Sequence, residues 1–162
     1  MSSIRVSLFT LCMVALLGSS AIRAENTSDF ALKDLDGKEH RVSDLSGKWL
    51  VLNFWATWCA PCIREMPELE AFYKKHKDDD AVVWGVTYED ISISKIRQFV
   101  ADLGVTYPIL GYGQQPYTGY GNVKVLPTTF LIDPQGKFYK RYEGPITAVQ
   151  LDRDIANADA EG

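Results

Sequence analysis

LVLNFWATWCAPC, residues 50–62, is the stretch that decides the fold of this chain. Its first seven residues form a short apolar run rich in aromatic and β-branched side chains, which predicts a buried strand. An amphipathic helical pattern follows from Pro61, a residue suited to the first helical turn because its missing N–H would have no partner there. The stretch therefore predicts a strand that passes directly into a helix, with two cysteines at the junction.

These two cysteines, Cys59 and Cys62, are three residues apart and can form a disulfide with each other. Cys59 is expected at the N-terminus of the helix, where unpaired N–H groups and the helix dipole favour the thiolate over the thiol. A thiolate is the form that attacks disulfides. The pattern therefore indicates thiol-disulfide exchange, with Cys59 as the nucleophile and the more deeply placed Cys62 as the resolving cysteine.

Three other interpretations of the cysteine pair compete with this one. A structural disulfide usually closes a longer loop, because so short a ring constrains the unfolded chain little. A zinc site needs about two further ligands, and apart from carboxylates only His40 and His76 are available, both in polar surroundings that suggest surface positions. The third interpretation is a redox-inactive remnant of the fold. Every residue of the motif is present, so the sequence does not support it.

Residues 1–24 have the pattern of a secretory signal peptide. Arg5 precedes an apolar stretch, residues 6–17, which is followed by small residues. The apolar stretch is short for a membrane-spanning helix. We expect cleavage after Ala21 or Ala24, and an uncleaved membrane anchor is the alternative interpretation.

Removing this segment changes the chemistry that remains in residues 25–162, which fit one domain. Cys12 is lost with the segment, so the motif cysteines are the only two of the mature chain. Exported proteins enter an oxidising compartment. A chain with only one closely spaced cysteine pair is then expected to use it for thiol-disulfide exchange. The loss of Arg5 and Arg23 lowers the basic residues from 17 to 15 against 21 acidic ones, a net charge of −6. This balance argues against nucleic acid as a partner.

The elements around the motif suggest one α/β domain. Residues 81–87 predict a second buried strand, and residues 94–103 a helix that Gly104 ends. A strand, helix and strand in this order form a parallel unit with a right-handed crossover. The first helix is expected to be interrupted and kinked at Pro67.

Two hairpins and a closing helix complete the prediction. Asp36-Gly37 is a two-residue turn signal between residues 30–35 and 38–42. A second antiparallel hairpin is expected across Pro134-Gln135-Gly136, and residues 147–156 suit a helix. The Gly- and Tyr-rich residues 111–121 predict a loop, with contact to substrate as the alternative.

With Asn53–Cys62 and the segment LPTTFLID (Leu126–Asp133), the chain resembles the thioredoxin superfamily, and within it the exported TlpA/ResA/DsbE (CcmG) group of thiol-disulfide oxidoreductases. The resemblance covers about residues 30–156. It implies a thioredoxin-like α/β fold with a central mixed sheet flanked by helices, an N-terminal β-hairpin, and a central insertion that begins at Tyr88.

The resemblance also implies which residues contact substrate. It implies a cis bond between Leu126 and Pro127 in a loop that faces the cysteines, where substrate backbone can pair as an added strand. The alternative is an ordinary turn proline before an edge strand. The predicted substrate-binding residues are Trp58, Ala60, Pro61, Leu126, Pro127 and Thr128.

Asn53 and Glu65 separate the chain from ordinary thioredoxin. Asn53 stands where thioredoxin has a buried aspartate that assists proton transfer, and an amide cannot take that proton. Glu65 matches the acidic residue that ResA-like proteins place beneath the cysteines, where burial would raise its pKa and let it exchange protons with Cys62. The alternative for Glu65 is a solvent-facing helix carboxylate.

The activity that the resemblance implies is extracytoplasmic, in the periplasm or an equivalent space, and carried out by a monomer without bound cofactor or metal. It implies reduction of disulfides in exported proteins such as apocytochrome c, and recharging by a membrane electron donor of the DsbD or CcdA type. A disulfide-donating oxidase and a non-catalytic binding module with the same fold are the alternatives. Whether the protein reduces or oxidises its partners depends on its reduction potential, which a CxxC sequence does not determine.

Overall fold

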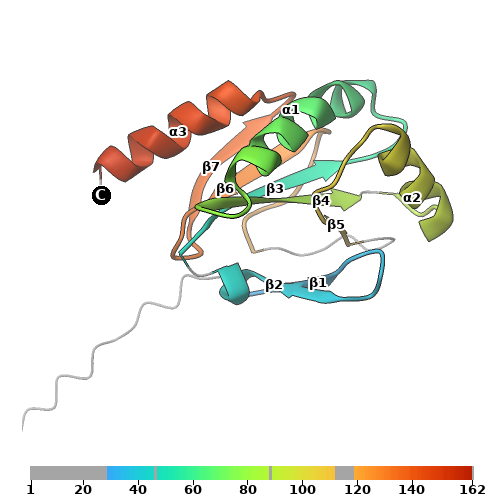
Figure 1. Ribbon diagram of the computed structural model, residues 1–162, viewed down its shortest axis with the longest axis horizontal. Helices are drawn as coiled ribbons and strands as arrows, with labels where there is room; N and C mark the ends of the chain where they lie inside the picture. The colour runs from blue at the N-terminus through green and yellow to red at the C-terminus, as the bar shows by residue number, and fades with distance from the viewer. Residues whose placement is uncertain (1–28, 46, 88, 112–118, 162) are drawn as a thin grey trace, which may run out of the picture.

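The structure, a computed structural model, describes residues 29–45, 47–87, 89–111 and 119–161 (Figure 1). Its core is a five-stranded sheet of order β5-β4-β3-β6-β7, in which β3, β4 and β5 are parallel and β6 and β7 are antiparallel to their neighbours. This arrangement confirms the predicted thioredoxin-like mixed sheet. The strands are β3 (Trp49–Trp55), β4 (Ala81–Thr87), β5 (Ile109–Leu110), β6 (Thr128–Ile132) and β7 (Phe138–Glu143).

The central strand β3 is buried along its whole length. Its alternate residues enter two separate cores: Val51 and Trp55 pack with the helices on one face, and Leu52 and Phe54 pack on the other face. Because both faces are covered, the strand carries a continuous apolar run rather than an alternating one. Asn53 is the one polar residue within this run, and it lies on the helical face.

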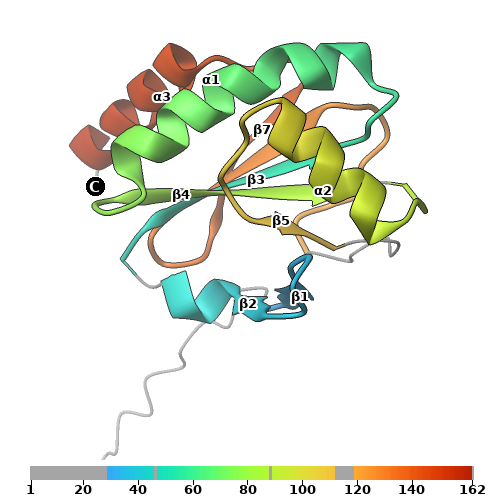
Figure 2. The same ribbon diagram turned by 45° about the vertical axis from the view of Figure 1, so that its right-hand side comes forward.

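Three helices lie on that face of the sheet (Figures 1 and 2). Each contributes side chains to the core there. They are α1 (Ala60–His76), α2 (Ile93–Asp102) and α3 (Ala148–Glu161). The connection β3-α1-β4 joins two parallel strands, as predicted. The sequence predicts that Pro67 interrupts α1, but the helix is continuous through this residue. Burial of Met66 and Leu69 on either side of Pro67 holds the backbone in the helix.

A small hairpin lies on the opposite face of the sheet from the helices (Figure 2). Its strands are β1 (Ala31–Lys33) and β2 (Glu39–Arg41), which pair antiparallel and precede a short 3-10 helix, η1 (Val42–Leu45). The hairpin was predicted correctly, but the prediction of a two-residue turn is wrong.

The observed turn has three residues, because the N–H of Asp34 donates to the carbonyl of Lys38 at 2.9 Å. The Asp34 carboxylate accepts from the backbone of Asp36 and Lys38 and so stabilises the wider loop. Gly37 closes it with a φ of +81°, in the left-handed region that glycine adopts readily.

Three sequence predictions fall partly or wholly outside the described residues. They are the signal peptide of residues 1–24, most of the Gly/Tyr-rich loop 111–121, and Tyr88 at the start of the insertion. Within the part of the chain that the structure describes, no helix has the length and apolar character needed to cross a membrane.

Candidate active site

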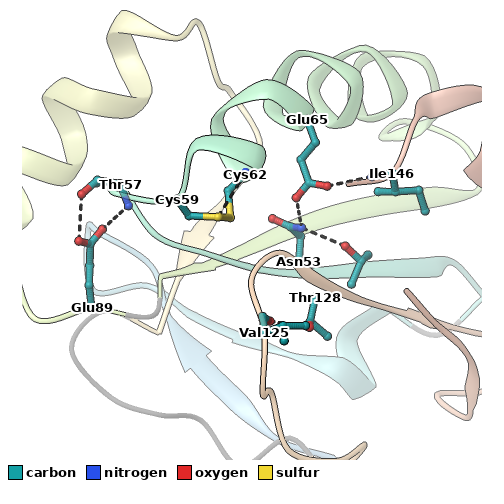
Figure 3. The surroundings of a disulfide bond; sticks show 10 residues. Asn53, Thr57, Cys59, Cys62, Glu65, Glu89, Val125, Thr128 and Ile146 are labelled. Carbon is teal, nitrogen blue, oxygen red and sulfur yellow. Dashed lines mark hydrogen bonds between the residues drawn. A yellow bond between two sulfur atoms is a disulfide. The ribbon is translucent and has the colours of Figure 1, made fainter. Parts of the chain in front are cut away.

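Cys59 and Cys62 form a disulfide at the start of α1, with an S–S distance of 2.09 Å (Figure 3). Cys59 is the N-cap residue of the helix, and its Sγ accepts a hydrogen bond from the N–H of Cys62 at 3.3 Å. Pro61 occupies the first helical turn, as predicted. Cys59 keeps 4% of its surface exposed and Cys62 none. Both cysteines are thus buried, and Cys59, the less buried of the two, is the one at the positive end of the helix dipole.

The surface next to the disulfide is formed by residues that flank the cysteines. Trp58 is 69% exposed, whereas Trp55 is fully buried in the core. Ala60 is exposed and Pro61 half-buried. A large aromatic ring thus projects into solvent beside Cys59.

The predicted proline loop lies at the same edge of the sheet. The Leu126–Pro127 bond is cis, and Thr128 at the start of β6 pairs with Phe54 near the end of β3. Because these two strands are antiparallel, the start of β6 lies beside the junction that leads to Cys59. Leu126 is half-buried, whereas Pro127 and Thr128 are buried, and the Thr128 hydroxyl donates to the carbonyl of Val125 at 2.8 Å. Contacts by these residues with a substrate stay a prediction.

Glu65 lies one helical turn beyond Cys62 and points into the protein (Figure 3). It is 2% exposed, which contradicts the alternative of a solvent-facing carboxylate. Its oxygens accept hydrogen bonds from the Asn53 side-chain amide at 2.8 Å and from the N–H of Ile146 at 3.0 Å. Burial raises the pKa of Glu65 to about 7, although both hydrogen bonds act in the opposite direction.

Asn53 supplies the link between Glu65 and the sheet. Its amide nitrogen donates to Glu65 and also to the Thr129 hydroxyl on β6 at 2.9 Å. The residue that replaces the aspartate of ordinary thioredoxin is therefore a hydrogen-bond donor to a carboxyl group carried by α1. The buried acid of this site comes from the helix instead of from β3.

Glu89 is a site residue that the sequence analysis missed. Its two carboxylate oxygens accept from the N–H of Thr57 at 2.6 Å and from the Thr57 hydroxyl at 2.9 Å (Figure 3). Thr57 lies two residues before Cys59, so Glu89 holds the loop that carries the nucleophile. Only the strand register reveals the contact: Trp55 pairs with Thr87 in the parallel strands, and Thr57 and Glu89 each follow their strand by two residues.

The two histidines occupy more specific positions than the surface roles predicted for them. His40 is half-buried, contacts Asp34 at 2.7 Å and packs its ring against Trp84. His76 is half-buried between Asp80 and Asp152, each at 2.7 Å. Across the described residues, no group of three or more His, Cys, Asp or Glu side chains is arranged to hold a metal ion.

Comparisons with known proteins agree with this geometry. A family model described as AhpC/TSA family matches residues 24–141. The thiol-disulfide oxidoreductase ResA of Geobacillus kaustophilus (strain HTA426) is 37% identical over 153 residues, which cover 94% of this chain and 84% of the relative.

Two solved structures are similar over most of their length. One is a putative thiol:disulfide interchange protein DsbE from Chlorobium tepidum, with a TM-score of 0.68, 31% identity, and coverage of 80% of this chain and 92% of that chain. The other is an exposed lipoprotein thioredoxin from Streptococcus pneumoniae strain TIGR4, with a TM-score of 0.64, 30% identity, and coverage of 80% and 98%.

Proposed function

Because the chain belongs to the AhpC/TSA family of thioredoxin-like proteins and is a thiol-disulfide oxidoreductase, we propose that it reduces disulfides of exported proteins outside the cytoplasm through Cys59 and Cys62. The observation that carries this proposal is the Cys59–Cys62 disulfide at the N-terminus of α1. Cys59 directly follows the exposed Trp58, and Glu65 is buried one helical turn beyond Cys62.

The proposed reaction starts from the reduced pair. The Cys59 thiolate attacks one sulfur of the partner disulfide, which forms a mixed disulfide and expels the other partner sulfur as a thiolate. Cys62 then attacks the Cys59 sulfur, and the second partner sulfur leaves. Two electrons pass to the partner, whose thiolates take protons from water, and the Cys59–Cys62 disulfide is the oxidised product.

Glu65 is the proposed acceptor of the proton that Cys62 must lose before it attacks. A carboxyl group with a pKa of about 7 can take and release a proton near neutral pH. Its hydrogen bonds to Asn53 and Ile146 keep the carboxyl group pointed into the protein. Asn53 has no proton to exchange in this role and acts by orientation alone.

Several observations support the proposed location, substrate class and electron source. Residues 1–24 have a signal-peptide pattern, and the similar pneumococcal thioredoxin is described as an exposed lipoprotein. The similarity to ResA and to a DsbE-type interchange protein favours apocytochrome c as the first substrate to test. We further propose that a membrane donor of the DsbD or CcdA type reduces the pair again, and that no bound cofactor takes part.

Trapping of mixed disulfides tests this function. In a Cys62→Ser variant the second step is blocked, so Cys59 should remain covalently bound to its partners, which mass spectrometry identifies after non-reducing electrophoresis. The double variant Cys59→Ser, Cys62→Ser is the matched control and should trap nothing. Adducts with exported proteins, apocytochrome c among them, are expected.

The result that overturns the proposal is the absence of any adduct that depends on Cys59, because a binding module without turnover predicts that result. Direction is tested separately by the reduction potential of the pair, measured against glutathione. A difference of about 30 mV already changes the equilibrium constant about tenfold. A potential well above that of the compartment would instead make the protein a disulfide donor.

A further inference from the structure

Four buried polar side-chain atoms on the helical face of the sheet have no hydrogen-bond partner. They are the amide oxygen of Asn53, the indole nitrogen of Trp55 and the hydroxyl oxygens of Thr87 and Tyr107. Tyr107 is 2% exposed and the other three are fully buried. Among the residues that the structure describes, the only other buried side-chain atoms without a hydrogen bond belong to Arg141, whose Nη2 instead forms an ion pair with Glu143. The four atoms thus form an unusual concentration, since buried polar groups are nearly always bonded to protein or ordered water.

The strand register brings Asn53, Trp55 and Thr87 to one face of the sheet, and Tyr107 reaches the same face from the segment before β5. Asn53 pairs with Gly85 and Trp55 with Thr87 across the parallel strands β3 and β4, and side chains of paired residues point to the same face. A Cβ on Gly85 would lie 2.9 Å from the Ile109 side chain, 2.9 Å from a ring carbon of Tyr107 and 3.1 Å from the Trp55 indole nitrogen. Tyr107 and Trp55 therefore converge over Gly85, whose lack of a side chain lets both approach the sheet.

The four atoms are chemically complementary to water. The Trp55 indole only donates, the Asn53 amide oxygen only accepts, and the hydroxyls of Thr87 and Tyr107 do both. A buried water molecule typically makes about three hydrogen bonds to groups of this kind. We propose that at least one buried water binds among the four unpartnered polar atoms, bridges Asn53, Trp55 and Tyr107, and extends the Glu65–Asn53 hydrogen-bond network to the Tyr107 hydroxyl.

Asn53 connects this water site to the redox site. Its amide nitrogen already donates to Glu65 and Thr129, so a water on its oxygen fixes the orientation of the amide. Tyr107 then acts as a positioning residue for Glu65 through the water and Asn53. Burial, followed by the negative charges of Glu65 and Glu70, raises the pKa of Tyr107, so its hydroxyl stays protonated while Glu65 titrates.

Two measurements on the oxidised protein test the site. The first is the magnetisation transfer between water and the Trp55 indole N–H in a nitrogen-15 labelled sample. A direct water contact is expected at this fully buried indole and should be lost in Tyr107→Phe, which removes only the hydroxyl. Tyr73→Phe is the matched control, because Tyr73 packs edge-on against Tyr107 but contributes no atom to the group.

The second measurement is the carbon-13 shift of the Glu65 carboxyl against pH. In Tyr107→Phe the titration midpoint should rise by about 0.5 pH unit, because the ionised carboxylate loses nearby polar solvation. Tyr73→Phe should leave it unchanged. The proposal is overturned if the wild-type indole shows no water contact, or if both variants behave alike in either measurement.

This inference rests on the proposed role of Glu65 only where it links the water to catalysis. If Cys62→Ser traps no partner, the proposed function fails while the indole contact still decides the water site. If the indole contact is missing but partners are trapped, the water site fails and the function stands.

Discussion

Burial gives the Glu65 carboxyl group a proton affinity that solvent would not allow. Its two hydrogen-bond donors, the Asn53 amide and the Ile146 N–H, are neutral and offset only part of the cost of burying a charge. The pKa therefore rises to about 7 from an ordinary 4.5. The same change makes the stability of the folded protein depend on pH.

The unfolding free energy should fall between pH 5 and pH 8 because of Glu65. The folded state binds the Glu65 proton more tightly than the unfolded state, so the stabilisation is fully present below pH 4.5 and is lost as pH rises through 7. The loss amounts to about 2 to 3 kcal/mol. Urea unfolding of Glu65→Gln should lack this decrease. The control is Glu68→Gln, which changes an exposed carboxylate on the same helix and should keep the decrease. If the unfolding free energy fell equally with pH in wild type and Glu65→Gln, the assignment of the decrease to Glu65 would be contradicted.

Glu89 should contribute to stability through Thr57 alone. Replacing it by alanine leaves the Thr57 N–H and hydroxyl without their acceptor, which we expect to cost about 1 to 3 kcal/mol. Amide hydrogen exchange at Thr57 should speed up, and so should alkylation of reduced Cys59, because the loop before it is released. Asp90→Ala, an exposed neighbour, should change neither rate. Unchanged amide hydrogen exchange at Thr57 in Glu89→Ala would show that the hydrogen bonds between Glu89 and Thr57 contribute nothing to stability.

At the level of elements, α3 is joined to the rest of the domain by buried and half-buried carboxylates. Asp154 accepts from the Tyr142 hydroxyl at 2.6 Å and from Lys140 at 2.9 Å, both on β7. Asp152 accepts from Lys75 and contacts His76 on α1. The helix is thus held to the edge strand and to the neighbouring helix at once.

Asp154→Asn should loosen α3 and remove an acid-sensitive contribution to stability. Burial alone would raise the pKa of Asp154, but the hydrogen bonds from Tyr142 and Lys140 outweigh it and lower the pKa below its ordinary value of 3.8. The stabilisation is present above that value and is lost as pH falls through the lower folded-state pKa. Thermal unfolding should show a cost of about 1 to 3 kcal/mol at pH 7 that shrinks in acid below pH 4. If the difference in stability between wild type and Asp154→Asn were the same at all pH values, the acid-sensitive contribution of Asp154 would be contradicted.

For the whole molecule, we predict a monomer. One edge strand, β5, has only two residues, and the other, β7, carries Lys140 and Arg141 near its middle. Short edges and charged side chains both oppose pairing with a second copy. Sedimentation velocity of residues 25–162 at micromolar concentration should give a single monomeric species. A dimer would contradict the prediction.

The parts of the fold that local pattern determines could be predicted from the sequence. The bounds of β4 at residues 81–87 and the place of Cys59 before α1 follow from apolar runs and from Pro61. The burial of Glu65 follows from the resemblance, although its partner Ile146 lies 81 residues away. Local pattern does not contain contacts such as Glu89 with Thr57 or Tyr107 over Gly85, because they depend on strand register.

The errors at Pro67 and in the first hairpin have other causes. Local propensity favours a break at Pro67 and a two-residue turn at Asp36-Gly37. The packing of Met66 and Leu69, and the carboxylate of Asp34 accepting two backbone N–H groups, override these preferences. Two buried side chains in the helix, and two local hydrogen bonds in the hairpin, suffice to reverse these tendencies.

The residues around the disulfide come from segments spread between Asn53 and Ile146, more than half of the chain. Asn53 lies on β3, Glu65 on α1, Glu89 after β4, Thr129 on β6 and Ile146 before α3. A synthetic peptide that carried only Trp58 to Cys62 would have both thiols and none of these neighbours. Anyone who wishes to graft this chemistry onto another scaffold must therefore transfer the complete domain, since no smaller piece contains the surroundings that distinguish these cysteines from any other pair.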